Sequence, residues 1–179
     1  MKLPANCPHR RSAKNWSSTL SCGGDLDQPA CCRTTDGDIL RPFLPKRGPL
    51  CESRDRTPEE YRFTWHSSFH GAAVVQIGNG KNIILDWARS GWGTNGRYWC
   101  CIAKAQWKRL EAAVLAAKFW GLDADIDRLG CDGAQWLIEG HRGDMYRAVR
   151  RWSPDGAIHD LGRAFFDIAG PPIADIRLY

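Results

Sequence analysis

An acid and a base at the end of a predicted strand form the first candidate for catalysis. Glu139 and His141 lie two positions apart, and residues with this spacing on a strand share one face of its sheet. Asp132 and Asp144 lie in the turns on either side. A carboxylate beside an imidazole could serve as general acid and base in a small hydrolase or transferase. An ordinary polar hairpin is the alternative, because the sequence holds no phosphate loop, nucleophile elbow or metalloprotease helix.

The second predicted hairpin, which joins strands 134–139 and 145–152, carries the densest cations of the region expected to fold. These cations are Arg142, Arg147, Arg150 and Arg151. Strand parity places Arg147 and Arg151 on one face and Arg150 on the other. Neither face of residues 145–152 is cleanly apolar, which predicts a bulge in the middle of the strand. The charges either protect an edge strand from unwanted pairing or dock an acidic partner or a phosphate-bearing ligand.

One tryptophan lies apart from the expected core. The chain has nine tryptophans, and Trp92 stands in a loop with glycines at positions 91, 93 and 96. Tryptophan is favoured at the energetic centres of protein interfaces, so Trp92 could anchor a partner or fold back over the sheet. Together with Arg142, Arg147 and Arg151 it completes the set of residues that we predict to bind a protein partner.

A run of acidic residues resembles the start of a calcium loop. Asp123, Asp125 and Asp127 match the first three ligand positions of an EF-hand. Arg128 stands where the loop needs glycine, and Ala134 stands where it needs a bidentate glutamate. We therefore predict no metal site and no cofactor.

The charge and the prolines set residues 1–58 apart from the rest of the chain. Residues 1–56 carry ten Lys/Arg against six Asp/Glu, a net of +4, whereas residues 57–179 carry fifteen against fourteen, a net of +1. Residues 1–58 hold seven prolines and only 18 apolar residues without a helical or strand period, which predicts an irregular segment, in part disordered. Nucleic-acid binding through this basic segment is a weaker alternative, because a specific fold concentrates its cations on a structured element.

The cysteines and the first residues bear on the compartment. Five of the eight cysteines lie in the first 51 residues and none forms a Cys-x-x-Cys pair, so free thiols and disulfides both stay open. The first twenty residues hold no apolar signal core, so we expect a cytoplasmic protein as the sequence is written. A secreted or periplasmic location is expected if the start is misassigned. No apolar run approaches the ~18 residues of a membrane helix, so no membrane contact is predicted.

Hydrophobic periodicity from residue 59 predicts the elements that position these residues. Aromatic and polar residues alternate over 61–69, a helical spacing runs over 107–121, and Gly121 is expected as the left-handed cap of that helix. The expected order is strands at 61–69, 73–77, 82–87 and 97–102, a helix at 107–121, strands at 134–139 and 145–152, and a helix at 158–168. We therefore predict an α+β domain over 59–179, an antiparallel sheet of about six strands with two helices packed on one face.

Several short motifs within residues 59–170 resemble a group of uncharacterised small bacterial α+β proteins. The motifs are Gly130-Cys131-Asp132-Gly133-Ala134-Gln135-Trp136, Glu139-Gly140, Tyr146 and Arg151-Trp152-Ser153-Pro154, after an aromatic first strand and a Trp/Leu helix that ends near Phe119-Trp120. The resemblance implies the same order of elements and often a secretory or lipoprotein signal, which these first residues lack. The group has no established catalytic residues. A complete fold pattern without a reactive constellation favours a non-enzymatic binding module, inhibitor- or immunity-like.

Overall fold

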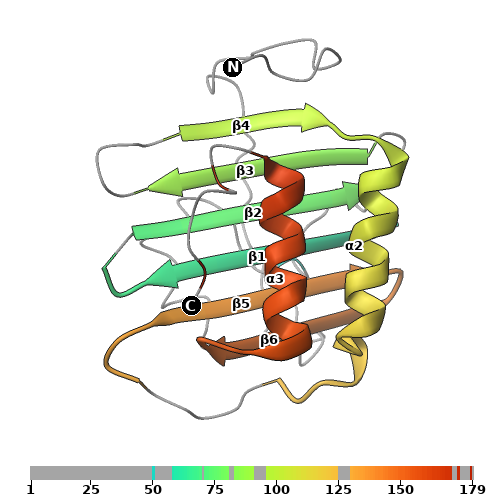
Figure 1. Ribbon diagram of the computed structural model, residues 1–179. Coiled ribbons are helices and arrows are strands. Elements are labelled where there is room, and N and C mark those ends of the chain that lie inside the picture. The colour runs from blue at the N-terminus through green and yellow to red at the C-terminus, as the bar shows by residue number, and fades with distance from the viewer. Residues whose placement is uncertain are drawn as a thin grey trace, which may run out of the picture.

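In the part of the chain that the structure describes, six antiparallel strands form one sheet, and two helices pack on the same face of it. A computed structural model describes residues 50, 58–69, 71–80, 83–90, 96–124, 130–170, 173 and 178. In chain order the elements are β1 (Glu59–Ser67), β2 (Gly71–Asn79), β3 (Ile83–Ser90), β4 (Gly96–Cys101), α2 (Lys104–Ala116), the 3-10 turn η3 (Phe119–Gly121), β5 (Ala134–Arg142), β6 (Met145–Trp152) and α3 (Gly156–Ala169). The strand order is β4-β3-β2-β1-β5-β6, and Figure 1 shows α2 and α3 across one face. The predicted α+β class, antiparallel sheet and pair of helices are confirmed.

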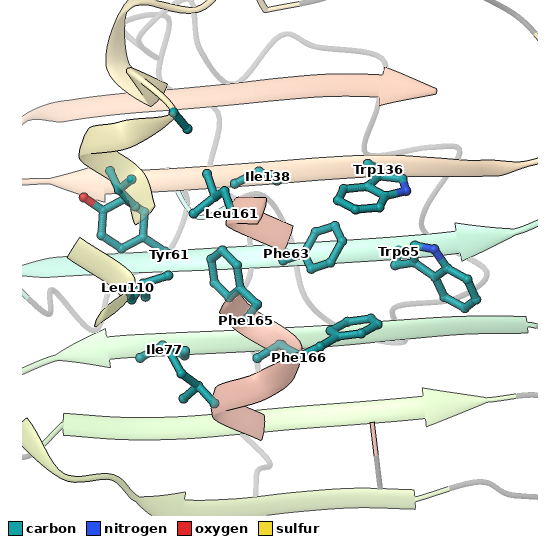
Figure 2. Packing of buried hydrophobic residues seen from close by; sticks show 14 of the residues in the cluster. Tyr61, Phe63, Trp65, Ile77, Leu110, Trp136, Ile138, Leu161, Phe165 and Phe166 are labelled. Carbon is teal, nitrogen blue, oxygen red and sulfur yellow. The ribbon is translucent and has the colours of Figure 1, made fainter. Parts of the chain in front are cut away.

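The central strand β1 sends its aromatic side chains toward the helices. Tyr61, Phe63 and Trp65 alternate along β1 and are all buried, as the period of a half-covered strand requires. They meet buried side chains of the neighbouring strands and of both helices (Figure 2), among them Ile77, Leu110, Trp136, Ile138, Leu161, Phe165 and Phe166. The Phe63 ring centroid lies 4.8 Å from that of Trp136 and 5.3 Å from that of Phe166. This cluster is the main hydrophobic core.

The helix α2 ends earlier than its periodicity predicts. It stops at Ala116, and the left-handed residue that follows is Lys118 with φ 49°, not Gly121, which lies inside η3. The turn buries Phe119, whose ring centroid lies 6.1 Å from that of Tyr61. The early break thus lets Phe119 bury its large apolar surface against β1, which stabilises the turn.

The hairpin of β5 and β6 is regular, so the predicted bulge in residues 145–152 is wrong. The register runs without interruption from Gln135 opposite Trp152 to Arg142 opposite Met145. The turn needs Gly143, which adopts φ +57°. The mixed polarity of residues 145–152 has another cause. β6 is an edge strand, so Arg147 and Arg151 can lie on the face that carries the core and still extend beyond the border of the sheet.

Two further observations concern the predicted boundaries. Leu50, which falls in the segment predicted to be irregular, is buried and donates its backbone N–H to Glu139 Oε1 at 3.1 Å. The boundary at residue 58 itself stays a prediction. Across the residues that the structure describes, no helix has the length and apolar character that a membrane crossing demands.

The close approach of α3 to the sheet depends on Gly162. A Cβ added at this position would overlap the Trp136 ring, whereas a Cβ at Gly121 would meet nothing within 4 Å. We expect Gly162→Ala to lower the free energy of unfolding by about 1–3 kcal/mol through overpacking, despite the better helix propensity of alanine. Urea denaturation measures this, with Gly121→Ala as the control that stays within about 0.5 kcal/mol of the wild type. Equal stability of the two variants would contradict the packing seen here.

Candidate functional site: a surface at the β5–β6 hairpin

The face of the sheet turned away from the helices carries a buried charged pair. The register places Arg62 of β1 opposite Glu139 of β5. Arg62 Nε donates to Glu139 Oε2 at 2.6 Å, and Arg62 Nη2 lies 2.5 Å from the same oxygen. The two residues are 3 % and 1 % exposed. Because the desolvation of two charges is expensive, such a pair stabilises a fold only when its geometry is complete.

The second oxygen of Glu139 is engaged as fully as the first. Tyr146 of β6 donates its hydroxyl to Glu139 Oε1 at 2.9 Å, and the backbone N–H of Leu50 donates to the same oxygen. The carboxylate therefore accepts hydrogen bonds from a guanidinium, a phenol and an amide. The hydrogen-bonding capacity of the carboxylate is therefore taken up by groups of the protein itself.

The predicted acid–base group is not assembled around this carboxylate. His141 is half-buried and lies opposite Glu60 of β1, while Asp132 and Asp144 are exposed in the flanking turns. General acid–base catalysis needs a group that can exchange a proton with a substrate within hydrogen-bond reach. Glu139 is buried and accepts hydrogen bonds from three donors, so a substrate cannot reach its carboxylate. Its role is to stabilise the fold. Glu139 and His141 do lie on one face of the sheet, as their spacing of two residues along a strand predicts.

On the helix-bearing face, the end of the hairpin forms a second polar cluster around Arg142. Arg142 Nε donates to Glu59 Oε1 at 2.8 Å, and its Nη2 donates to the hydroxyl of Tyr61 at 3.0 Å. The guanidinium carbon lies 5.4 Å from the ring centroid of Trp120 in η3. The Arg142 side chain nevertheless keeps 43 % of its surface exposed. It is thus a cation held in one orientation and open to solvent on one side.

The electrostatics of this cluster keep Arg142 charged and Tyr61 neutral. The hydrogen bond to Glu59 raises the pKa of the Arg142 guanidinium above its ordinary value. Burial raises the pKa of the Tyr61 phenol, and its hydrogen bond of 2.6 Å to the Glu59 carboxylate raises it further. A phenol that donates to a carboxylate disfavours its own ionisation, because two negative charges would meet.

Two more side chains extend the exposed surface beside Arg142. Met145 lies opposite Arg142 in the register and is 52 % exposed. Arg147 lies opposite Gly140. The rings of Phe119 and Tyr61 pack so closely on Gly140 that a Cβ added there would lie within 3.0 Å of both. Met145 and Arg147 therefore stand on the same face as Arg142, where η3 covers the end of β5. We call Trp120, Arg142, Met145 and Arg147 the hairpin corner.

The predicted partner-binding arginines thus divide between surface and interior. Arg151 is 7 % exposed, and its Nη2 donates to the backbone carbonyl of Asp123 at 2.9 Å. It ties β6 to the segment after η3 and offers no surface to a partner. Arg147 is half-buried, and no acid among the residues that the structure describes pairs with it. Only Arg142 and Arg147 of the three candidates lie at the hairpin corner.

Other predicted features lie partly or wholly beyond the described chain. Trp92 and the basic segment proposed for nucleic acid fall outside the described residues, so their roles stay predictions. Among the His, Cys, Asp and Glu residues that are described, no group of three could hold a metal ion. Cys101 and Cys131 are exposed free thiols.

Sequence reasoning missed Trp120 and Met145 as surface residues. Trp120 was expected at the end of the long helix, and its position depends on the early break at Lys118. The residue type of Met145 gives no signal of exposure, because methionine is among the residues most often buried.

The comparisons with known proteins add no family. Neither protein-family models nor curated proteins match the sequence. The resemblance of residues 59–170 to uncharacterised bacterial proteins therefore stays a resemblance, and the site is interpreted from its own geometry.

The Arg62–Glu139 pair makes a prediction about stability. We expect Glu139→Ala to lower the free energy of unfolding by about 3–5 kcal/mol, because it removes the carboxylate that pairs with the buried Arg62 guanidinium. The double variant Arg62→Met with Glu139→Leu should recover a large part of that loss, since neither charge then remains. Urea denaturation measures both, and Glu111→Ala on the half-exposed side of α2 is the control. A double variant no more stable than Glu139→Ala would show that the pair is not the cause.

Tyr61 makes a prediction about alkaline pH. Its pKa is raised in the folded chain, so the unfolded chain loses the phenolic proton first, from pH about 10 upward. The stability that Tyr61 contributes is therefore complete below pH about 10 and declines as the pH rises above it. We expect the free energy of unfolding to fall less steeply with pH in Tyr61→Phe than in the wild type above pH about 10. Identical slopes in urea denaturation would exclude this explanation.

Proposed function

We propose that this protein is a non-enzymatic interaction module that binds an acidic segment of a partner protein through the hairpin corner. The observation that carries the proposal is Arg142, which is oriented by Glu59 and Tyr61, packed over Trp120 and still 43 % exposed. A side chain already ordered in the free protein loses little entropy when a partner binds, which favours affinity.

The residue types of the hairpin corner support a protein partner. Tryptophan, arginine and methionine are enriched at protein interfaces relative to the remaining surface. Met145 offers exposed apolar area next to the cationic group of Arg142, so one partner segment could bury the first and pair with the second. A partner of this kind needs an acidic group beside an apolar one.

The charge of the hairpin supports an acidic partner. Residues 145–152 hold three arginines and no acid, and Arg147 extends the positive potential of Arg142 along β6. Complementary charge raises the rate of association and excludes partners of like charge. The hydrolase or transferase alternative gains no support from the geometry, because Glu139 is buried among its three donors.

A charge reversal at the hairpin corner tests the proposal. The tagged full chain is used to retain proteins from the cells that produce it, and quantitative mass spectrometry compares the wild type with Arg147→Glu and Met145→Asp. We expect at least one acidic protein to be retained by the wild type and reduced more than about tenfold with either variant, the effect of losing roughly 1.4 kcal/mol.

Lys108→Glu is the matched control for this experiment. Lys108 is exposed on α2, away from the hairpin, and its reversal changes the net charge by the same amount as Arg147→Glu. The partner should be retained by Lys108→Glu as by the wild type. If every retained protein binds Arg147→Glu and Met145→Asp as well as the wild type, the hairpin corner is not the binding surface.

A further inference from the structure

Among the residues that the structure describes, contacts to the outer edge of β6 lie along only part of its length. The backbone N–H of Arg150 donates to the carbonyl oxygen of Ala124 at 2.7 Å, and the Arg151 side chain reaches the carbonyl of Asp123. Both contacts lie at the C-terminal half of the strand. The segment after η3 thus protects this half of the edge from pairing with another strand.

The bond from Arg150 also fixes the direction of the backbone groups along β6. In an antiparallel pair, residues alternate between those that bond to the neighbouring strand and those whose N–H and C=O point away from it. Arg150, opposite Leu137, bonds away from β5, so it belongs to the second class. Ala148, opposite Glu139, lies two positions earlier and belongs to the same class. The N–H and C=O of Ala148 therefore point away from β5, toward the outer edge of the sheet. Ala148 is half-buried, so part of its surface is open to solvent.

The side chains along this edge select the kind of strand that could pair with it. Pairing with β6 of a second copy would bring arginines of both copies together, and like charges on neighbouring strands are destabilising. An acidic segment would instead meet Arg147 and, at the start of the strand, the hairpin corner. Exposed edges bind extended peptides through main-chain hydrogen bonds, while side-chain pockets provide the selectivity.

We propose that the partner binds as an added strand: an extended acidic segment pairs with β6 at Ala148 and places its acidic side chains beside Arg147 and Arg142. This inference rests on the proposed function and specifies how the acidic partner is held. Ala148 supplies the main-chain donor and acceptor, and the hairpin corner supplies the charge and the apolar contact.

The test uses the full chain and a synthetic peptide of alternating Glu and Val labelled with a fluorophore. Fluorescence anisotropy gives its Kd for the wild type, and the same peptide with Lys in place of Glu should not bind. Ala148→Pro removes the outward N–H, and proline is tolerated on an edge strand where that N–H faces solvent. We expect Ala148→Pro to weaken binding at least tenfold, whereas the matched control Ala148→Val, which keeps the N–H, binds within about threefold of the wild type.

Hydrogen exchange on the unmodified protein gives a second measurement that does not depend on how a variant folds. The Ala148 amide should exchange more slowly when the Glu-Val peptide is bound, whereas the Arg150 amide, already bonded to Ala124, should change little. An Ala148 amide unaffected by saturating peptide would overturn the strand-addition proposal.

The outcomes separate this inference from the proposed function. If Arg147→Glu weakens peptide binding while Ala148→Pro and Ala148→Val bind alike, the acidic partner is held by side chains and strand addition is wrong. If the wild type binds the Glu and Lys peptides equally, or binds neither, both the strand addition and the acidic partner are contradicted.

Discussion

The pairing of Arg62 with Glu139 is the constraint on which the centre of the sheet depends. Helices cover one face of the sheet, and β1 must therefore present its aromatic residues to that face and its polar residues to the other. Arg62 of β1 and Glu139 of β5 are both charged and buried, so each must find its partner in the register that the other strand provides. A shift of one residue between β1 and β5 would both separate this pair and turn Phe63 away from the core. Electrostatics and packing thus specify the same register.

The middle and the start of β1 use charge in different ways. At its middle, Arg62 and Glu139 neutralise each other within the structure and leave no charge to solvent. At its start, Glu59 orients Arg142 through a single carboxylate oxygen, and the arginine remains open on one side. The first arrangement stabilises the fold. The second leaves an oriented cation partly exposed at the end of the β5–β6 hairpin. This contrast is the reason for placing the function at the hairpin.

The sequence predicts the local elements well and the contacts between distant elements poorly. Alternation in 61–67 and the helical spacing that begins at Trp107 identify the strand and the helix, because each pattern depends only on neighbouring residues. The cap of α2 was placed wrongly, because the burial of Phe119 against Tyr61 ends the helix at Ala116. Propensity alone favoured Gly121, and a tertiary contact overrode it.

The same reasoning explains which part of the candidate site could be predicted. Strand parity placed Arg147 and Arg151 on one face, as the register shows. It could not show that Arg151 binds a carbonyl of the segment after η3, since that contact joins residues 28 positions apart. Nor could it pair Arg142 with Glu59, 83 positions away, which distinguishes an oriented arginine from an ordinary surface charge.

The hydrogen bond from Leu50 to Glu139 bears on where an independently folding unit begins. Alternation of apolar and polar residues starts at Glu59, and a fragment cut there would keep strands β1 to β6 and helices α2 and α3. Such a fragment would nevertheless leave the innermost carboxylate of the sheet short of one amide donor, contributed from 89 positions upstream. A fragment that begins at or before Leu50 would keep this donor, so we expect it to be more stable than one cut at Glu59.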